Sequence, residues 1–206
     1  MLRNNIIEIF GQTWPTLLIC MVIIISLRVV YLIKNKEKII LHRELITIAF
    51  ITYVLCLFYV VTFQDVSWSS SNFIPFKEIL RYDFGSRLFL KNILGNIIMF
   101  LPYGFFVGYY LKLDKTNIAL FLTLLVSTTI ETTQLIIGRV FDIDDILLNV
   151  IGGLLGCSIF TILHKIENRL PDFLKKDWFY NIIVILVSLV FILYLFNFIK
   201  LGVKNE

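Results

Sequence analysis

Charged residues are scarce in this sequence, and their scarcity argues against an ordinary soluble domain. Only 17% of the 206 residues are charged, whereas 58% are hydrophobic and 15% are aromatic. A soluble domain usually carries about 25% charged residues. The charges are also unevenly spread, because long uncharged runs alternate with short charged patches. Since about 20 consecutive apolar residues cross a bilayer as a helix, we expect an all-α, polytopic transmembrane helical bundle.

Cysteine is also rare, and its spacing suits no metal site or disulfide framework. Cys20, Cys56 and Cys157 each lie inside an apolar run, where a thiol acts as a small hydrophobic side chain. The sequence contains no recognisable Ser/His or Cys/His nucleophile arrangement. The net charge of +4 is modest. Its lysines and arginines stand beside apolar runs, which suits lipid headgroups and makes a nucleic-acid partner unexpected.

The apolar runs predict six membrane spans, with five as the alternative. The spans cover about residues 14–33, 45–63, 92–111, 116–137, 145–163 and 178–199. The first is too long and begins too late for a cleaved signal peptide, so we expect a retained helix. We therefore predict a single membrane domain over residues 1–206 and a multi-pass protein of the cell membrane. Glycine pairs spaced GxxxG in the third and fifth spans, Gly104/Gly108 and Gly152/Gly156, favour close helix approach.

The distribution of lysine and arginine predicts the orientation. The larger group, in the shorter loops, is assigned to the cytoplasm, so both termini should face outward. The longest connection, residues 64–91, would then lie outside. It interleaves Phe73, Ile74 and Phe76 with charged residues such as Lys77 and Arg81. That pattern is typical of an amphipathic interfacial segment or a re-entrant one.

Polar residues inside the spans gather near one membrane boundary. Asn96, Glu131, Gln134 and Asn149 each lie three to six residues from the outer end of their span. At a rise of 1.5 Å per residue, they all fall within roughly 5–10 Å of the same boundary. A carboxylate inside a span is unfavourable, so Glu131 should face the bundle interior and have a partner. We expect either a structural ion pair of Glu131 with Arg139 or a working site.

Three aspartates follow directly in the stretch "FDIDD", at Asp142, Asp144 and Asp145. Aspartates at the start of a helix cap free backbone N–H groups, but capping needs fewer than three. A divalent cation held by these carboxylates is the alternative, because hard ions take clustered oxygen ligands. No other cofactor is expected. Asp145, Asn149 and Gly152 recur at i, i+4 and i+7, so they form one stripe along the fifth span.

Four motifs follow one another along the chain: "NFIPF" (72–76), "GNIIMFLPYGF" (95–105), "ETTQLIIGRVFDIDD" (131–145) and "NVIGGLLG" (149–156). In this order and spacing they resemble the VanZ-like family of bacterial membrane proteins. The resemblance covers residues 72–160 as a family core, with additional helices and loops in 1–71 and 161–206. It implies ligand-binding roles for the matching polar positions. We therefore expect the binding residues to be Asn72, Pro75, Phe76, Asn96, Glu131, Gln134, Arg139, Asp142, Asp145 and Asn149.

The resemblance also implies a role in the cell envelope, because the family's named member gives low-level resistance to teicoplanin. Our first hypothesis is a non-enzymatic protein that binds a lipid headgroup, a lipid-linked wall precursor or the lipid-bearing antibiotic. The second is an intramembrane enzyme that modifies an envelope lipid, with Glu131 as general base beside the aspartates. A small transporter is disfavoured, because the polar residues gather near one face. The oligomeric state does not follow from the sequence.

Overall fold

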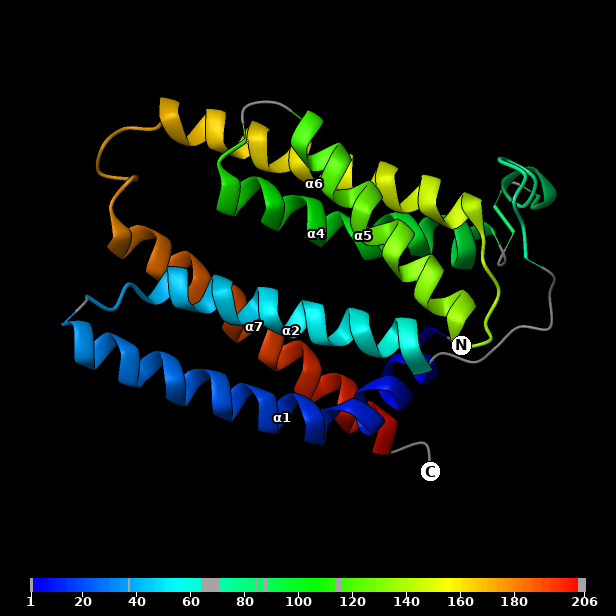
Figure 1. Cartoon of the computed structure of the whole chain (residues 1–206). Helices are drawn as coiled ribbons and strands as arrows, with labels where there is room; N and C mark the ends of the chain where they lie inside the picture. Colours follow the sequence, from blue (N-terminus) through cyan, green and yellow to red (C-terminus); the bar gives the residue numbers. More distant parts are fainter. Residues whose placement is uncertain are drawn as a thin grey trace. The chain divides into compact units, whose positions relative to one another are not determined.

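The chain folds into helices. The computed structural model describes residues 2–36, 38–63, 71–83, 85–86, 89–113 and 116–203. The α-helices in these ranges are α1 (Leu2–Asn35), α2 (Leu41–Phe63), α4 (Gly95–Leu111), α5 (Asn117–Ile136), α6 (Ile143–Arg169) and α7 (Asp177–Val203) (Figure 1). A short 3-10 turn, η1 (Ile79–Arg81), and a π-helical turn, η2 (Leu90–Leu94), precede α4. Within the described ranges there is no β-strand, and the only β-type pairing is an isolated bridge between Asn72 and Asp142. The all-α prediction is therefore confirmed.

Five helices are long and apolar enough to cross a membrane. Their candidate spans are Trp14–Asn35, Leu41–Thr62, Asn92–Leu111, Asn117–Ile136 and Ile143–Arg169. Each coincides with a span expected from hydropathy. The sixth predicted span begins in α7, whose stretch Asp177–Val190 is a shorter apolar helix. The chain is thus a membrane protein built from apolar helices.

The chain divides into two compact units, which we describe separately. Unit 1 comprises Met1–Thr13 and Tyr53–Ile166, and unit 2 comprises Trp14–Thr52 and Glu167–Glu206. In unit 2, the guanidinium of Arg28 on α1 holds the carboxylate of Glu44 on α2 through two hydrogen bonds of 2.9 Å. A single membrane domain over residues 1–206 stays a prediction.

Unit 1 contains α4, α5 and α6, which pack through glycine. A methyl group on Gly104 of α4 would collide with the backbone of Gly153 on α6. Likewise, a methyl group on Gly152 or Gly156 would run into α4 backbone, at the carbonyls of Ile97 and Leu101 respectively. Backbone-to-backbone contact of this kind needs residues without a Cβ. The close helix approach expected from the GxxxG spacing is therefore confirmed.

The third helix of this group, α5, turns a narrow and largely polar face inward. Its buried residues recur every fourth position: Ala119, Thr123, Ser127 and Glu131. Thr123 meets α6 at Gly153, where a Cβ would touch the threonine side chain. The opposite face is apolar and exposed, for example at Phe121. Because lipid replaces water around a membrane helix, apolar side chains face outward and polar ones are kept for helix contacts.

Candidate functional site

The turn between α5 and α6 brings distant carboxylates together. Gly138 takes a left-handed conformation with φ of +82°, which suits a residue without a Cβ. Gly138 N–H donates to Leu135 O at 3.2 Å and Arg139 N–H to Gln134 O at 2.8 Å. This pair of bonds is the Schellman arrangement that ends a helix. The chain then doubles back, and Asp142 N–H donates to the Glu131 carboxylate at 3.0 Å.

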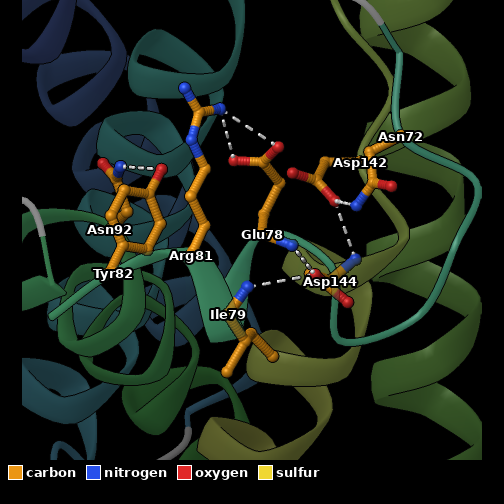
Figure 2. A network of polar contacts seen from close by, with 8 residues as sticks. All are labelled: Asn72, Glu78, Ile79, Arg81, Tyr82, Asn92, Asp142 and Asp144. Atoms are coloured by element: carbon orange, nitrogen blue, oxygen red, sulfur yellow. Dashed lines mark hydrogen bonds and ion pairs between the residues drawn. The ribbon is translucent and has the colours of Figure 1, made fainter. Parts of the chain in front are cut away.

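Asn72 joins the 71–83 segment to this turn. Its backbone N–H donates to Phe141 O at 2.8 Å, and its carbonyl accepts from Ile143 N–H at 3.0 Å. The side-chain amide also donates to Asp142 Oδ1 at 2.9 Å (Figure 2). Asn72 is buried, so these bonds are shielded from solvent. The predicted site residues Asn72, Asp142 and Glu131 therefore form one connected chain of hydrogen bonds.

Asp144 anchors the same segment from the first turn of α6. Its carboxylate accepts backbone N–H bonds from Phe76 at 2.5 Å, Glu78 at 2.8 Å and Ile79 at 3.2 Å. The last two of these bonds are drawn in Figure 2. Only 1% of Asp144 is exposed. Charged hydrogen bonds of this kind are stronger than neutral ones, so Asp144 holds the 76–79 turn in place.

The aspartates are not arranged as metal ligands. Among the described residues, no group of three or more His, Cys, Asp or Glu side chains is placed to hold a metal ion. Asp144 directs both oxygens to backbone N–H groups, and Asp142 Oδ1 accepts from Asn72 and from Asp144 N–H. Asp145 bonds to a different helix. The hydrogen bonds of Asp142 and Asp144 thus disfavour the expected divalent cation at these carboxylates.

The inner part of the site lies between α4, α5 and α6. Asn96 of α4 donates its side-chain amide to Asp145 Oδ1 of α6. One turn further along α6, Asn149 Nδ2 donates to Ser127 Oγ of α5 at 2.9 Å. Asn149 is 1% exposed, and its Oδ1 is the buried side-chain atom without a hydrogen-bond partner among the described residues.

Arg139 does not form the ion pair with Glu131 that the sequence suggested. Its Nη1 donates instead to the carbonyl of Val61, near the end of α2. Gln134 Nε2 approaches the same carbonyl at 3.4 Å. A carbonyl in the last turn of a helix has no partner within its own helix, so it readily accepts such donors. Arg139 and Gln134 thus tie α2 to the α5 end and lie beside the carboxylates without pairing with them.

Pro75 and Phe76, by contrast, stand on the surface of the 71–83 segment. Phe76 is 57% exposed and Leu80 is 82% exposed. Phe76 also has a left-handed backbone with φ of +66°, which is uncommon for a bulky residue. Lys77 is exposed next to them, as is Arg81, which pairs with Glu78 at 3.3 Å. The segment therefore combines exposed apolar and basic side chains, the composition expected of an interfacial segment.

Carboxyl groups gather at this end of unit 1. Asp145 is near enough to Glu131 and Asp142 for electrostatic repulsion between the carboxylates. Outside the spans, burial raises the pKa of Asp142 above its ordinary value, against the opposing effect of the hydrogen bonds from Asp144 N–H and Asn72. In the described part of the chain, none of these acids forms an ion pair.

Sequence reasoning missed several residues of the arrangement. Ser127 and Thr123 lie four and eight residues before Glu131, so the helical period of α5 could have placed them on the same face. The carbonyl of Val61 carries no signal in the sequence. Asp144 was expected to cap its own helix or to hold a metal ion, whereas it accepts backbone N–H groups of residues 76–79 instead.

Several membrane-crossing apolar helices, three of which enclose a buried polar cluster near one end, define a polytopic helical membrane protein. Within that class, the chain belongs to the VanZ/LLP1 family, whose model matches residues 50–164. The match contains all four motifs on which the resemblance rests. No curated protein and no solved structure matches the chain.

Proposed function

We propose that this protein sits in the bacterial cell membrane and binds the headgroup of an envelope lipid or lipid-linked wall precursor at the polar end of α4, α5 and α6. Binding there would protect cells at a low level against lipid-bearing glycopeptides such as teicoplanin. The orientation follows from the lysine and arginine distribution, which assigns this end to the outer face. The family membership of the chain supports the envelope role.

One observation carries the proposal, namely that three separate helices direct buried or half-buried polar side chains to the same end. Asn96, Glu131 and Asp145 come from α4, α5 and α6. Asn96 contacts Asp145 directly, and Glu131 reaches the start of α6 through Asp142 N–H. Polar groups inside a bilayer are unfavourable and are kept where they bind or react.

The 71–83 segment supports the same proposal from outside the helices. It is fastened to the α5–α6 turn by Asn72 and to α6 by Asp144. Its exposed Phe73, Ile74 and Leu80 suit the acyl boundary, while Lys77 suits a phosphate or carboxylate. The segment would therefore rest on the lipid surface beside the polar cluster and guide a headgroup toward it.

The test compares teicoplanin with vancomycin, which lacks the lipid tail, in cells with and without the protein. We expect lower susceptibility to teicoplanin alone. Glu131→Gln should abolish this effect at normal membrane abundance, because glutamine can still accept the Asp142 N–H bond. Thr133→Ala is the matched control, since Thr133 is exposed on α5 and bonds its own helix at Thr129 O. Equal shifts with both antibiotics, or full protection by Glu131→Gln, would contradict the proposal.

An intramembrane enzyme is the second candidate function, and one observation supports it. Glu131 is buried and accepts a single hydrogen bond from the described residues, so one of its oxygens stays available to act as a base. Asp142 and Asp144, however, are engaged in holding the 71–83 segment. Comparing lipid extracts of cells with and without the protein by mass spectrometry separates the two functions. A new or depleted lipid that depends on Glu131 would favour the enzyme.

A further inference from the structure

We infer that the headgroup held at this end carries a primary ammonium, as an aminophospholipid does. This inference rests on the proposed function and specifies the chemistry of its ligand. The group would lie between Glu131 of α5 and the stripe formed by Asp145 and Asn149 on α6. Three features of the cluster lead to this assignment: its acceptors, its charge and its buried amide.

The first feature is an excess of acceptors. Glu131 accepts one hydrogen bond, at Oε2, and Asp145 accepts one, at Oδ1. Among the described residues, the second oxygen of each carboxylate has no protein donor. An ionised carboxylate accepts several hydrogen bonds, and inside a membrane such capacity should not stay unused. The cluster therefore lacks donors.

The second feature is a shortage of positive charge, although Arg139 lies near enough to Glu131 to attract it. Glu131, Asp142 and Asp145 repel one another, and no described ion pair includes them. Arg139, the nearest basic residue along the chain, gives its Nη1 to the Val61 carbonyl. A phosphate or carboxylate would add further repulsion next to these acids. A cationic group would relieve it.

The third feature is Asn149, which points to a ligand independently of the carboxylates. Only 1% of Asn149 is exposed. It lies one helical turn after Asp145 on the same face of α6. Its Nδ2 donates to Ser127 on α5, and no residue in the described part of the chain donates to its Oδ1. A buried amide oxygen without a partner is unfavourable, and a donating ligand removes this cost.

These acceptors match a primary ammonium. Such a group has three N–H donors and no acceptor. Glu131, Asp145 and Asn149 offer one free acceptor oxygen each, counted over the described hydrogen bonds. A trimethylated ammonium has the same charge but no N–H donor, so it cannot satisfy Asn149. The site should therefore distinguish phosphatidylethanolamine from phosphatidylcholine, which differ only in these methyl groups.

The test measures lipid binding to the full-length protein in detergent by native mass spectrometry. The lipids are phosphatidylethanolamine, phosphatidylcholine and phosphatidylglycerol with identical acyl chains. We expect the Kd for phosphatidylethanolamine to be about tenfold lower than for phosphatidylcholine. Glu131→Gln and Asp145→Asn should each abolish this preference. Both variants keep an acceptor for the existing bonds from Asp142 N–H and Asn96, so folding is preserved.

Asp172→Asn is the matched control, because it removes the same charge at a fully exposed side chain. Its preference should equal that of the unaltered protein. Free ethanolamine separates the two sources of the amine: competition at millimolar concentration assigns a soluble amine, and failure to compete assigns the lipid. Equal Kd values for the ethanolamine and choline lipids would contradict the inference that the ligand is a primary ammonium, but they would still agree with a lipid-headgroup site. No lipid retained at all would overturn the proposed function itself.

Discussion

The substitution Asp144→Asn tests whether one buried carboxylate holds the 71–83 segment in place. Asp144 uses Oδ1 for Phe76 N–H and Oδ2 for Glu78 and Ile79 N–H. Asparagine has the same shape but presents one oxygen and one NH₂ group. Whichever way the amide turns, at least one backbone N–H faces another donor, and the remaining bonds lose the help of the negative charge.

The magnitude follows from the number of bonds affected. A hydrogen bond to a charged group contributes about 1.5–3 kcal/mol. Losing one such bond and weakening two others should lower the free energy of opening the segment by about 3 kcal/mol. A change of 1.36 kcal/mol alters an equilibrium tenfold, so amide exchange in the turn should become roughly 100-fold faster.

Hydrogen–deuterium exchange with mass spectrometry measures this directly on peptides that cover residues 71–83. Faster exchange should be confined to this segment, because α4, α5 and α6 pack through glycines away from Asp144. Asp83→Asn is the control, since Asp83 is an exposed aspartate of the same segment. Adding Mg²⁺ or a chelator should leave the exchange of the unaltered protein unchanged. Exchange in Asp144→Asn within about twofold of the unaltered protein would refute the reasoning.

Two further predictions concern helix packing and pH. Gly156→Ala drives a Cβ into the Leu101 carbonyl and should cost about 1–3 kcal/mol of stability, read as a lower thermal midpoint. Gly95→Ala, with open space at its Cβ, should not lower it, and equal midpoints for the two variants would contradict the packing argument. Because burial raises the pKa of Asp142 above 3.8, the folded state binds this proton more tightly than the unfolded chain. Stability should therefore fall as the pH rises from that value through the raised pKa, and Asp142→Asn, which retains the acceptor for Asn72, should flatten the curve. An unchanged slope in the chemical-denaturation series would contradict this assignment.

Much of the fold could be predicted because its signals are local. Long uncharged runs predicted the spans, and the spacing of Gly152 and Gly156 predicted close approach to another helix. Helical depth also identified Asn96, Glu131 and Asn149 as residues of one end. Each of these inferences uses distances along a single helix, and these are constant at 1.5 Å per residue.

The partners of those residues could not be predicted in the same way. Arg139 follows Glu131 by eight residues, just beyond the end of α5, and has the opposite charge, yet it bonds to the Val61 carbonyl. Glu131 is satisfied by a backbone N–H from the turn that follows its own helix. Backbone groups are the same in every residue, so their role as partners leaves no trace in the amino-acid sequence.

Composition and hydropathy alone indicated a membrane protein built from long apolar helices, with its polar residues expected near one boundary. Few other backbone structures can cross a bilayer, because each backbone polar group must find its hydrogen-bond partner within the protein. Tertiary structure decided what the acids do. It assigned Asp144 to the 76–79 turn, joined Asp142 to Asn72, and left Asn149 Oδ1 without a donor from the residues that the structure describes. These outcomes depend on contacts between segments about 70 residues apart. The aspartates are chemically alike, so the path of the folded backbone decides which of them meets which donor.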